Sequence, residues 1–236
     1  MDASKWTHET GGDGHGNQEL EYYTEDIANS QVVDGNLVIT ATSEGAAQHS
    51  CWNGTCQYTS ARLVTNGHYT TKYGRVEARI KIPTGKGVWP AFWMLGDNIS
   101  VVNWPTCGEL DIMESIGSES GTLHGSMHGP GYSGANPLTG STTLPGGAKL
   151  SDDFHVYSME WGPAVVRFYL DSVLYETRTP ADMPQGGVWV YDRPFFIILN
   201  VAVGGQWPGI PDGTATFPVK MLVDYVHVYD ATPAND

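Results

Sequence analysis

The chain has 236 residues, with 12 basic and 26 acidic side chains and a formal net charge of −14 at pH 7. This length fits one all-β domain and is sufficient to bury a substantial core. Nucleic acid is excluded as an expected partner, because binding to its phosphate backbone requires a basic surface. No apolar run reaches the roughly 20 residues of a membrane span, so we expect no membrane association either.

Short apolar or alternating runs between glycines and prolines predict strands along the whole chain, and no helix of three clear turns. Residues 74–83 alternate most clearly, with Val76, Ala78, Ile80 and Ile82 on one face. The predicted strands cover residues 36–42, 58–65, 74–83, 88–95, 109–116, 122–128, 155–161, 165–170, 173–178, 194–203 and 221–229. This pattern predicts an all-β sandwich or barrel, and we expect one domain over residues 1–236.

Three carboxylates lie within the apolar run of residues 109–114. Alternation places Glu109 and Asp111 on one face of a strand. It would turn Glu114 to the apolar face, where an unpaired carboxylate is costly. A β-bulge with one extra residue at Met113 would return Glu114 to the face of the other two acids. We therefore expect a row of three acids on one sheet face.

Two carboxyl groups that flank a scissile bond are the requirement for glycoside hydrolysis. On a concave sheet Glu109 and Glu114 would lean together, and a gap of about 5–5.5 Å between their carboxyl groups is the retaining geometry. A solvated edge strand with scattered acids is the alternative, but such strands rarely have so apolar an opposite face.

Other polar and aromatic side chains share faces of the predicted strands. Trp89 and Trp93 lie on one face of their strand, and both could be either core residues or part of a sugar site. His128 is a functional candidate if it lies beside Glu114, and otherwise a structural histidine. Asn200 lies in an apolar strand and needs partners, either in a ligand site or within the core.

The three cysteines do not form a zinc site. Cys51 and Cys56 bracket a short turn and could close a disulfide, whereas a reducing compartment would leave them free. Cys107 has no basic neighbour in the sequence, so we expect a small buried side chain rather than a reactive thiol.

Taken together, these residues resemble glycoside hydrolase family 16, and within it the bacterial endo-1,3-β-glucanases, or laminarinases. The spacing E-x-D-x-x-E is similar to that branch, whereas dedicated lichenases use E-x-D-x-E. The resemblance spans nearly the whole chain, through segments 16–24, 34–41, 58–65, 73–96, 107–117, 124–134, 154–161, 195–209 and 221–230.

The resemblance implies a β-jelly-roll sandwich of two antiparallel sheets with a substrate cleft on its concave face. It implies Glu109 as nucleophile, Glu114 as acid/base, and Asp111 as a hydrogen-bonding partner of the nucleophile. It implies a β-glucan as the partner and no cofactor for catalysis. The candidate substrate-binding residues are Asn17, Arg62, Trp89, Trp93, Trp104, His128, Asn200 and Trp207.

The family often binds one structural calcium, for which the resemblance implies the carboxylate of Asp224 and the backbone carbonyl of Gly35. Family members usually begin with a strand that carries a W-x-D-E-F-like segment and supplies a further calcium ligand. We do not find that segment in this sequence and expect the strand to be missing. We expect a secreted monomer, although the sequence shows no signal peptide at its start.

Two alternatives to an endo-β-1,3-glucanase remain at this point. Some recognition proteins resemble the family but lack the catalytic glutamates, and this chain retains both. A transglycosylase would share the covalent intermediate, so the sequence hardly separates it from a hydrolase. The sequence also leaves open the preference between pure 1,3-linked and mixed 1,3-1,4-linked glucans.

Overall fold

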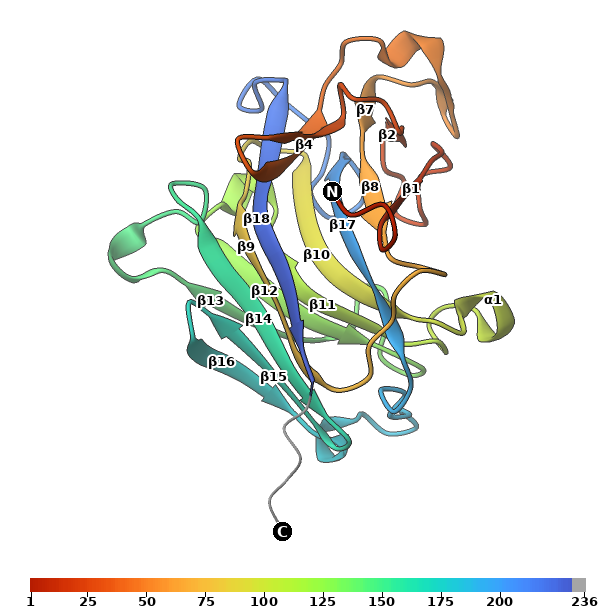
Figure 1. Ribbon diagram of the computed structural model, residues 1–236, viewed down its shortest axis with the longest axis vertical. Helices are drawn as coiled ribbons and strands as arrows, with labels where there is room; N and C mark the ends of the chain where they lie inside the picture. Colours follow the sequence, from red (N-terminus) through yellow and green to blue (C-terminus); the bar gives the residue numbers. More distant parts are fainter. Residues whose placement is uncertain (231–236) are drawn as a thin grey trace.

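Nearly all regular structure of the protein is β in the computed structural model, which describes residues 1–230 (Figure 1). The strands are β1 (Thr7–Glu9), β2 (Glu21–Tyr23), β3 (Ser30–Val33), β4 (Asn36–Ala41), β5 (Ser50–Cys51), β6 (Gly54–Thr55), β7 (Tyr58–Ser60), β8 (Arg62–Val64), β9 (Gly74–Lys81), β10 (Val88–Gly96), β11 (Glu109–Glu114), β12 (Thr122–His128), β13 (Leu138–Thr143), β14 (His155–Gly162), β15 (Val165–Leu170), β16 (Val173–Arg178), β17 (Phe195–Val203) and β18 (Val219–Tyr229). The helical elements are α1 (Ile99–Val102) and the 3₁₀ turns η1 (Ala46–Gln48), η2 (Gly117–Glu119), η3 (Pro145–Gly147) and η4 (Pro180–Asp182). Within residues 1–230, no helix is long and apolar enough to cross a membrane.

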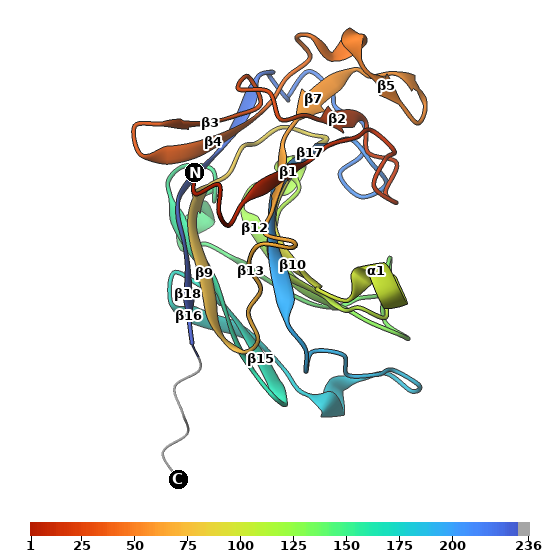
Figure 2. The same cartoon turned by 45° about the vertical axis from the view of Figure 1, so that its right-hand side comes forward.

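Two antiparallel sheets of seven strands form the body of the molecule (Figures 1 and 2). The first sheet has the order β1-β8-β17-β10-β11-β12-β13, and the second has the order β16-β15-β14-β9-β18-β4-β3. We call the face of the first sheet that points away from the second its open face. The predicted β-jelly-roll sandwich of two antiparallel sheets is therefore confirmed.

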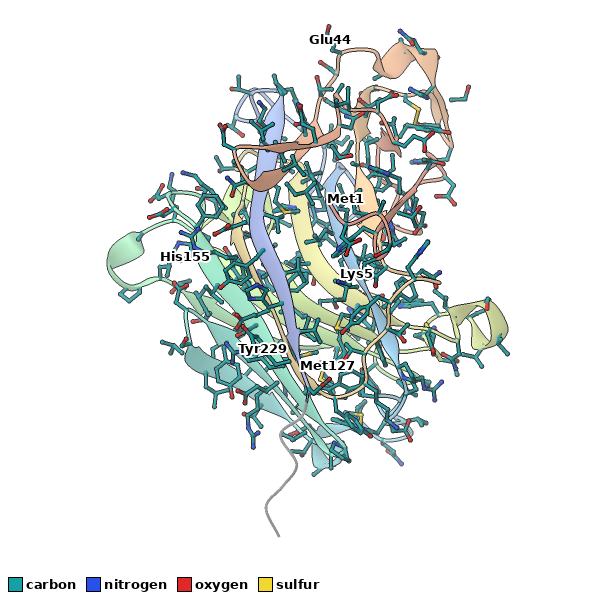
Figure 3. The ribbon with its side chains drawn as sticks, viewed as in Figure 1. Met1, Lys5, Glu44, Met127, His155 and Tyr229 are labelled. Carbon is teal, nitrogen blue, oxygen red and sulfur yellow. A yellow bond between two sulfur atoms is a disulfide. The ribbon has the colours of Figure 1, made fainter. Side chains whose placement is uncertain are left out.

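The core lies between the two sheets and is built by alternating side chains. Val76, Ala78 and Ile80 of β9 are fully buried, as their alternation predicts. Met127 of β12, in the first sheet, is also fully buried, whereas Tyr229 of β18, in the second sheet, is exposed; Figure 3 labels both. A smaller apolar cluster contains Leu95 and Cys107, so the sequence expectation of a buried Cys107 is confirmed.

The predicted strand at residues 58–65 is in fact two strands. β7 pairs in parallel with β2 in a small separate sheet, whereas β8 joins β1 and β17 in the first sheet. The chain changes sheets at Ala61, and a continuous β-like sequence gives no sign of such a change. The other predicted strands are present with ends that differ by at most two residues.

Two of the short connections are tight β-hairpins. Asp171 and Ser172 have positive φ angles of 46° and 68° and join β15 to β16 as a tight hairpin. β5 and β6 form a separate two-stranded hairpin that is closed by a Cys51–Cys56 disulfide. Of the two states that the sequence allowed for these cysteines, the structure has the oxidised one.

Candidate active site

A β-bulge in β11 turns the third acid toward the other two. Asp111 pairs with Ser126 of β12 and Glu114 pairs with His124, so two residues of β11 lie opposite Gly125 alone. These two residues, Ile112 and Met113, are fully buried in the core. The predicted bulge is confirmed, although in the pairing with β10 the unmatched residue is Ile112 rather than Met113.

Each of the two glutamates accepts a hydrogen bond from an indole nitrogen. Nε1 of Trp104, in the loop after α1, donates to Oε2 of Glu109 at 2.8 Å. Nε1 of Trp89, on β10, donates to Oε1 of Glu114 at 3.1 Å. The two predicted tryptophans therefore orient the two carboxyl groups directly.

His128 lies against Glu109 and Asp111. Its Nε2 is 3.5 Å from Oε1 of Glu109 and 3.3 Å from Oδ2 of Asp111. The sequence made His128 a functional candidate on the condition that it lies beside Glu114. In the strand register it pairs with Glu109 instead, and His124 pairs with Glu114, although the charge of His128 still opposes the rise in the pKa of Glu114. The register of the β11–β12 pair sets this arrangement, and the spacing of residues along one strand does not reveal it.

Burial raises the pKa of all three acids. The pKa of Glu109 rises to about 8, chiefly through burial and then through the charge of Asp111, although His128 and the Trp104 N–H oppose the rise. Burial also holds the pKa of Asp111 and of Glu114 well above their usual range. The charge of Asp111 adds more to the rise in the pKa of Glu114 than the charge of Glu109 does.

Three adjacent carboxyl groups in this environment cannot all be ionised at neutral pH. Glu109 is the least buried of the three acids, and besides its N–H donor the charge of Arg62 opposes the rise of its pKa, so Glu109 ionises most readily. Glu114 is 9% exposed and is the better holder of a proton. When Glu109 loses its proton and Glu114 keeps its own, one sheet face carries a carboxylate beside a carboxylic acid.

Arg62, Trp93 and Asn200 form a connected group next to the acids. Nε1 of Trp93 donates to Oδ1 of Asn200 at 2.7 Å, and the Arg62 guanidinium lies 4.8 Å from the centre of the Trp93 ring. Nδ2 of Asn200 donates to the hydroxyl oxygen of Tyr23 at 3.0 Å. The amide of Asn200 is therefore satisfied by protein groups and fixes the orientation of the Trp93 indole.

Asn17 joins this group through two residues that the sequence argument missed. Nδ2 of Asn17 donates to Oε1 of Glu19 at 3.0 Å, and the Tyr23 hydroxyl donates to Oε2 of Glu19 at 3.2 Å. The hydrogen bonds continue from Tyr23 to Asn200. Glu19 and Tyr23 lie within segment 16–24, which resembles the family, so the sequence could have marked them as candidates. Only the fold shows that Tyr23 contacts Asn200 of β17.

An aromatic group lies beside Glu114. The Trp207 ring is 5.3 Å from that of Trp89 and 5.1 Å from that of His124, edge-on in both cases. Trp207 is 41% exposed. Trp89 donates a hydrogen bond to Glu114 and packs against the exposed indole of Trp207, which is a suitable surface for a sugar ring.

The two predicted calcium ligands line one surface hollow together with Asp2. Carboxylate and carbonyl oxygens are the donors that calcium prefers, so the chemistry of Asp224, Gly35 and Asp2 fits that ion. Nη1 of Arg79 donates to Oδ2 of Asp224 at 2.8 Å, so the guanidinium would compete with a calcium ion for this carboxylate. Elsewhere in residues 1–230, Glu109, Asp111 and His128 bring ligand atoms within 4.8 Å of one another, but these residues belong to the acid cluster.

A glutamate that accepts one indole N–H and can ionise, next to a second glutamate that burial keeps protonated, meets the requirement for cleaving a glycosidic bond. On this β-sandwich, such a pair defines a glycoside hydrolase. The chain matches the family model described as "Glycosyl hydrolases family 16" over residues 17–227, and it belongs to that family.

Curated relatives match almost the whole chain. It is 42% identical to a beta-glucanase of Rhodothermus marinus, over 97% of this chain and 80% of that protein. It is 36% identical to the glucan endo-1,3-beta-glucosidase A1 of Niallia circulans, over 97% of this chain and 36% of that protein, about a third of its length. A beta-1,3-glucan-binding protein of Penaeus monodon is 30% identical over 94% of this chain and 76% of its own.

Solved structures of high similarity are laminarinases. The catalytic domain of the Thermotoga maritima laminarinase has a TM-score of 0.92 and 48% identity, over 98% of this chain and 94% of its own. An endo-beta-1,3-glucanase from Pyrococcus furiosus has a TM-score of 0.91 and 49% identity, over 98% and 89% of the two chains.

Proposed function

We propose that the protein is a retaining endo-β-1,3-glucanase that hydrolyses internal linkages of β-1,3-glucans such as laminarin. The observation that carries this proposal is the arrangement of Glu109 and Glu114, which the bulge brings to one face and which two indole N–H groups hold in place. The glucan-cleaving names of the relatives and structural neighbours support the choice of substrate.

In the first step the ionised carboxylate of Glu109 attacks the anomeric carbon of the sugar. The protonated Glu114 donates its proton to the glycosidic oxygen, so that the leaving part of the chain departs with a free hydroxyl group. The products of this step are a glycosyl ester on Glu109 and an ionised Glu114. His128 and Trp104 lie on the Glu109 side, where they stabilise the carboxylate before attack.

In the second step Glu114 acts as a base. Esterification removes the negative charge of Glu109, and the ionised Glu114 takes a proton from a water molecule that attacks the anomeric carbon. The ester bond to Glu109 breaks and the sugar is released with its original anomeric configuration. Asp111, almost fully buried between the two glutamates, shares a proton with Glu109 and tunes both steps.

Two other functions are compatible with the scaffold but have less support. A glucan-binding protein without activity has no need for paired glutamates with separated protonation states, and this chain has both. A transglycosylase would form the same ester and transfer the sugar to another chain instead of water. Cleavage of mixed 1,3-1,4-linked glucans is a possible extension of the same activity rather than a competing class.

The test is a substrate panel of laminarin, lichenan, curdlan and agarose, with products resolved by size and anomeric form. We expect internal cleavage of laminarin, with products that initially retain their configuration, and loss of turnover by orders of magnitude in Glu109→Ala and Glu114→Ala. Inverted first products, or a near-normal rate in either folded variant, would reject the mechanism. Products longer than the donor would indicate transglycosylation.

We propose in addition that Asp224 and Gly35 hold a structural calcium ion, with no role in the chemical step. An ion that binds only the folded state raises the melting temperature as its concentration rises. Chelation should therefore lower the melting temperature of the wild type and leave that of Asp224→Asn unchanged. Equal melting temperatures of the wild type with and without calcium would contradict this site.

We propose that the protein is secreted and acts as a monomer without a nucleic acid or membrane partner. The Cys51–Cys56 disulfide supports an oxidising compartment. The acidic net charge of −14 argues against a polyanionic partner. Light scattering during size exclusion measures the oligomeric state, and fractionation of the producing cells tests secretion.

A further inference from the structure

The hairpin of β5 and β6 carries an exposed tryptophan at its tip. Trp52 lies inside the short loop that the Cys51–Cys56 disulfide closes, and 48% of it is exposed. The hairpin belongs to neither large sheet. Figure 2 shows it projecting on the same side of the first sheet as α1, away from the second sheet.

Contacts of both the backbone and the indole of Trp52 fix the position of the ring. The Trp52 backbone N–H donates to the carbonyl of Gly12 at 2.8 Å, and Nε1 donates to the backbone carbonyl of Glu19 at 2.7 Å. A Cβ atom on Gly14 would lie 2.8 Å from Cδ1 and Nε1 of the ring, so only glycine allows this approach. The ring is thus held in place before any ligand binds, which reduces the entropy cost of binding.

The turn below the indole is the one that carries Asn17. The backbone N–H of Asn17 donates to the carbonyl of Gly14 at 2.9 Å, and the Asn17 side chain donates to Glu19, the same residue whose carbonyl holds Trp52. The Gln206 backbone N–H donates to the carbonyl of Asn17 at 2.9 Å. Hydrogen bonds therefore join Trp52, the turn of Asn17 and the loop that carries Trp207.

We propose that Trp52 is a stacking platform for one more glucose residue of the substrate, next to the turn of Asn17. A pyranose ring presents an apolar C–H face, and an immobilised, half-exposed indole is a suitable surface for it. This proposal rests on the proposed function, because it places the platform along the path of a β-1,3-glucan. The disulfide and the hairpin then serve to hold a binding residue rather than the fold.

The test compares long and short substrates. Trp52→Ala should lower kcat/KM on laminariheptaose about tenfold, the effect of losing roughly one stacking contact, and leave kcat/KM on laminaritriose within about twofold of the wild type. Trp52→Phe keeps a ring but loses the N–H to Glu19, and should retain most of the activity on the long substrate. Tyr229→Ala, which removes an exposed aromatic ring from the second sheet (Figure 3), is the matched control and should change neither value.

Three outcomes would overturn the platform. An equal loss on both substrates in Trp52→Ala would show that the indole only supports the turn of Asn17. A loss in Trp52→Phe as large as that in Trp52→Ala would assign the effect to the N–H group. Unchanged kinetics of Trp52→Ala on the long substrate would remove any role in binding. If the wild type cleaves neither oligosaccharide nor laminarin, the proposed function itself is what fails.

Discussion

Trp104 donates to Glu109 in a position where it favours the ionised nucleophile. Removing this donor should raise the pKa of Glu109, so activity should be lost at a higher pH as the solution is acidified. For Trp104→Phe we expect the acidic limb of the kcat/KM profile to move up by roughly half to one pH unit, allowing for the solvent exposure of the indole.

The matched control is Trp93→Phe. It removes an indole N–H that donates to Asn200 and not to a carboxylate. This variant should alter KM and leave the acidic limb in place. An acidic limb that moves equally in both variants would show that the Trp104 hydrogen bond does not set the protonation of Glu109.

The raised pKa of Glu109 also has a consequence for stability. Its pKa rises from 4.5 in the unfolded chain to about 8 in the folded protein, so the folded protein retains a proton that the unfolded chain releases. The stability associated with this carboxyl group is therefore fully present below about pH 4.5 and is lost as pH rises through 8. Glu109→Gln cannot ionise and keeps the same shape.

We expect Glu109→Gln to unfold with a free energy about 1–2 kcal/mol higher than that of the wild type at pH 8, and with a similar free energy near pH 4. Denaturant titrations at the two pH values measure the difference. Glu44→Gln, at an exposed position (Figure 3), is the control and should follow the wild type. A constant offset between Glu109→Gln and the wild type would contradict the linkage.

At the scale of the strand, the β11 bulge depends on the close packing of Tyr175 against Gly125 of β12. Gly125 lies opposite both bulge residues, and a Cβ atom there would lie 2.4 Å from the hydroxyl oxygen of Tyr175. Gly125→Ala should therefore lower the free energy of unfolding by about 1–3 kcal/mol, the usual cost of overpacking, and reduce activity by shifting Glu114.

The control lies four residues earlier, just before the same strand. A Cβ atom on Gly121 would meet only the carbonyl oxygen of Ala148, at 3.7 Å, so Gly121→Ala should change stability by less than about 0.5 kcal/mol. Thermal melts and laminarin hydrolysis of the two variants make the comparison. Equal behaviour would show that the bulge tolerates a side chain beneath it.

Strands of six or more residues with clear alternation could be predicted from the sequence, because burial on one face leaves a period-two pattern. Strands of two to four residues, such as β1, β3 and the β5–β6 pair, are too short to show one. β13 was missed because its sequence, Leu-Thr-Gly-Ser-Thr-Thr, has almost no apolar residues.

The same limit applies to the site. The bulge was predictable because three acids in an apolar run leave few alternatives. The partners of His128, and the path from Asn17 through Tyr23 to Asn200, depend on register and long-range pairing that no local pattern encodes. Local chemistry could thus be predicted, and contacts between distant segments could not.

At the scale of the whole molecule, the first 24 residues contribute to the site although the acids lie far along the chain. β1 pairs with β8, and Glu9 accepts a hydrogen bond from Nε of Arg62 at 3.2 Å. Tyr23 reaches Asn200 of β17. The orientation of Arg62 and Trp93 therefore depends on segments that close the edge of the first sheet.

The net charge of −14 should distinguish neutral from anionic substrates. A neutral glucan gains nothing from long-range attraction, so kcat/KM on laminarin should change by less than about twofold between roughly 0.05 and 0.5 M NaCl. Sulfated laminarin of the same chain length should be a poorer substrate at low salt, because the acidic surface repels it. Its kcat/KM should rise with salt as that repulsion is screened. Equal rates on the two polymers at low salt would show that the field near the site does not follow the total charge.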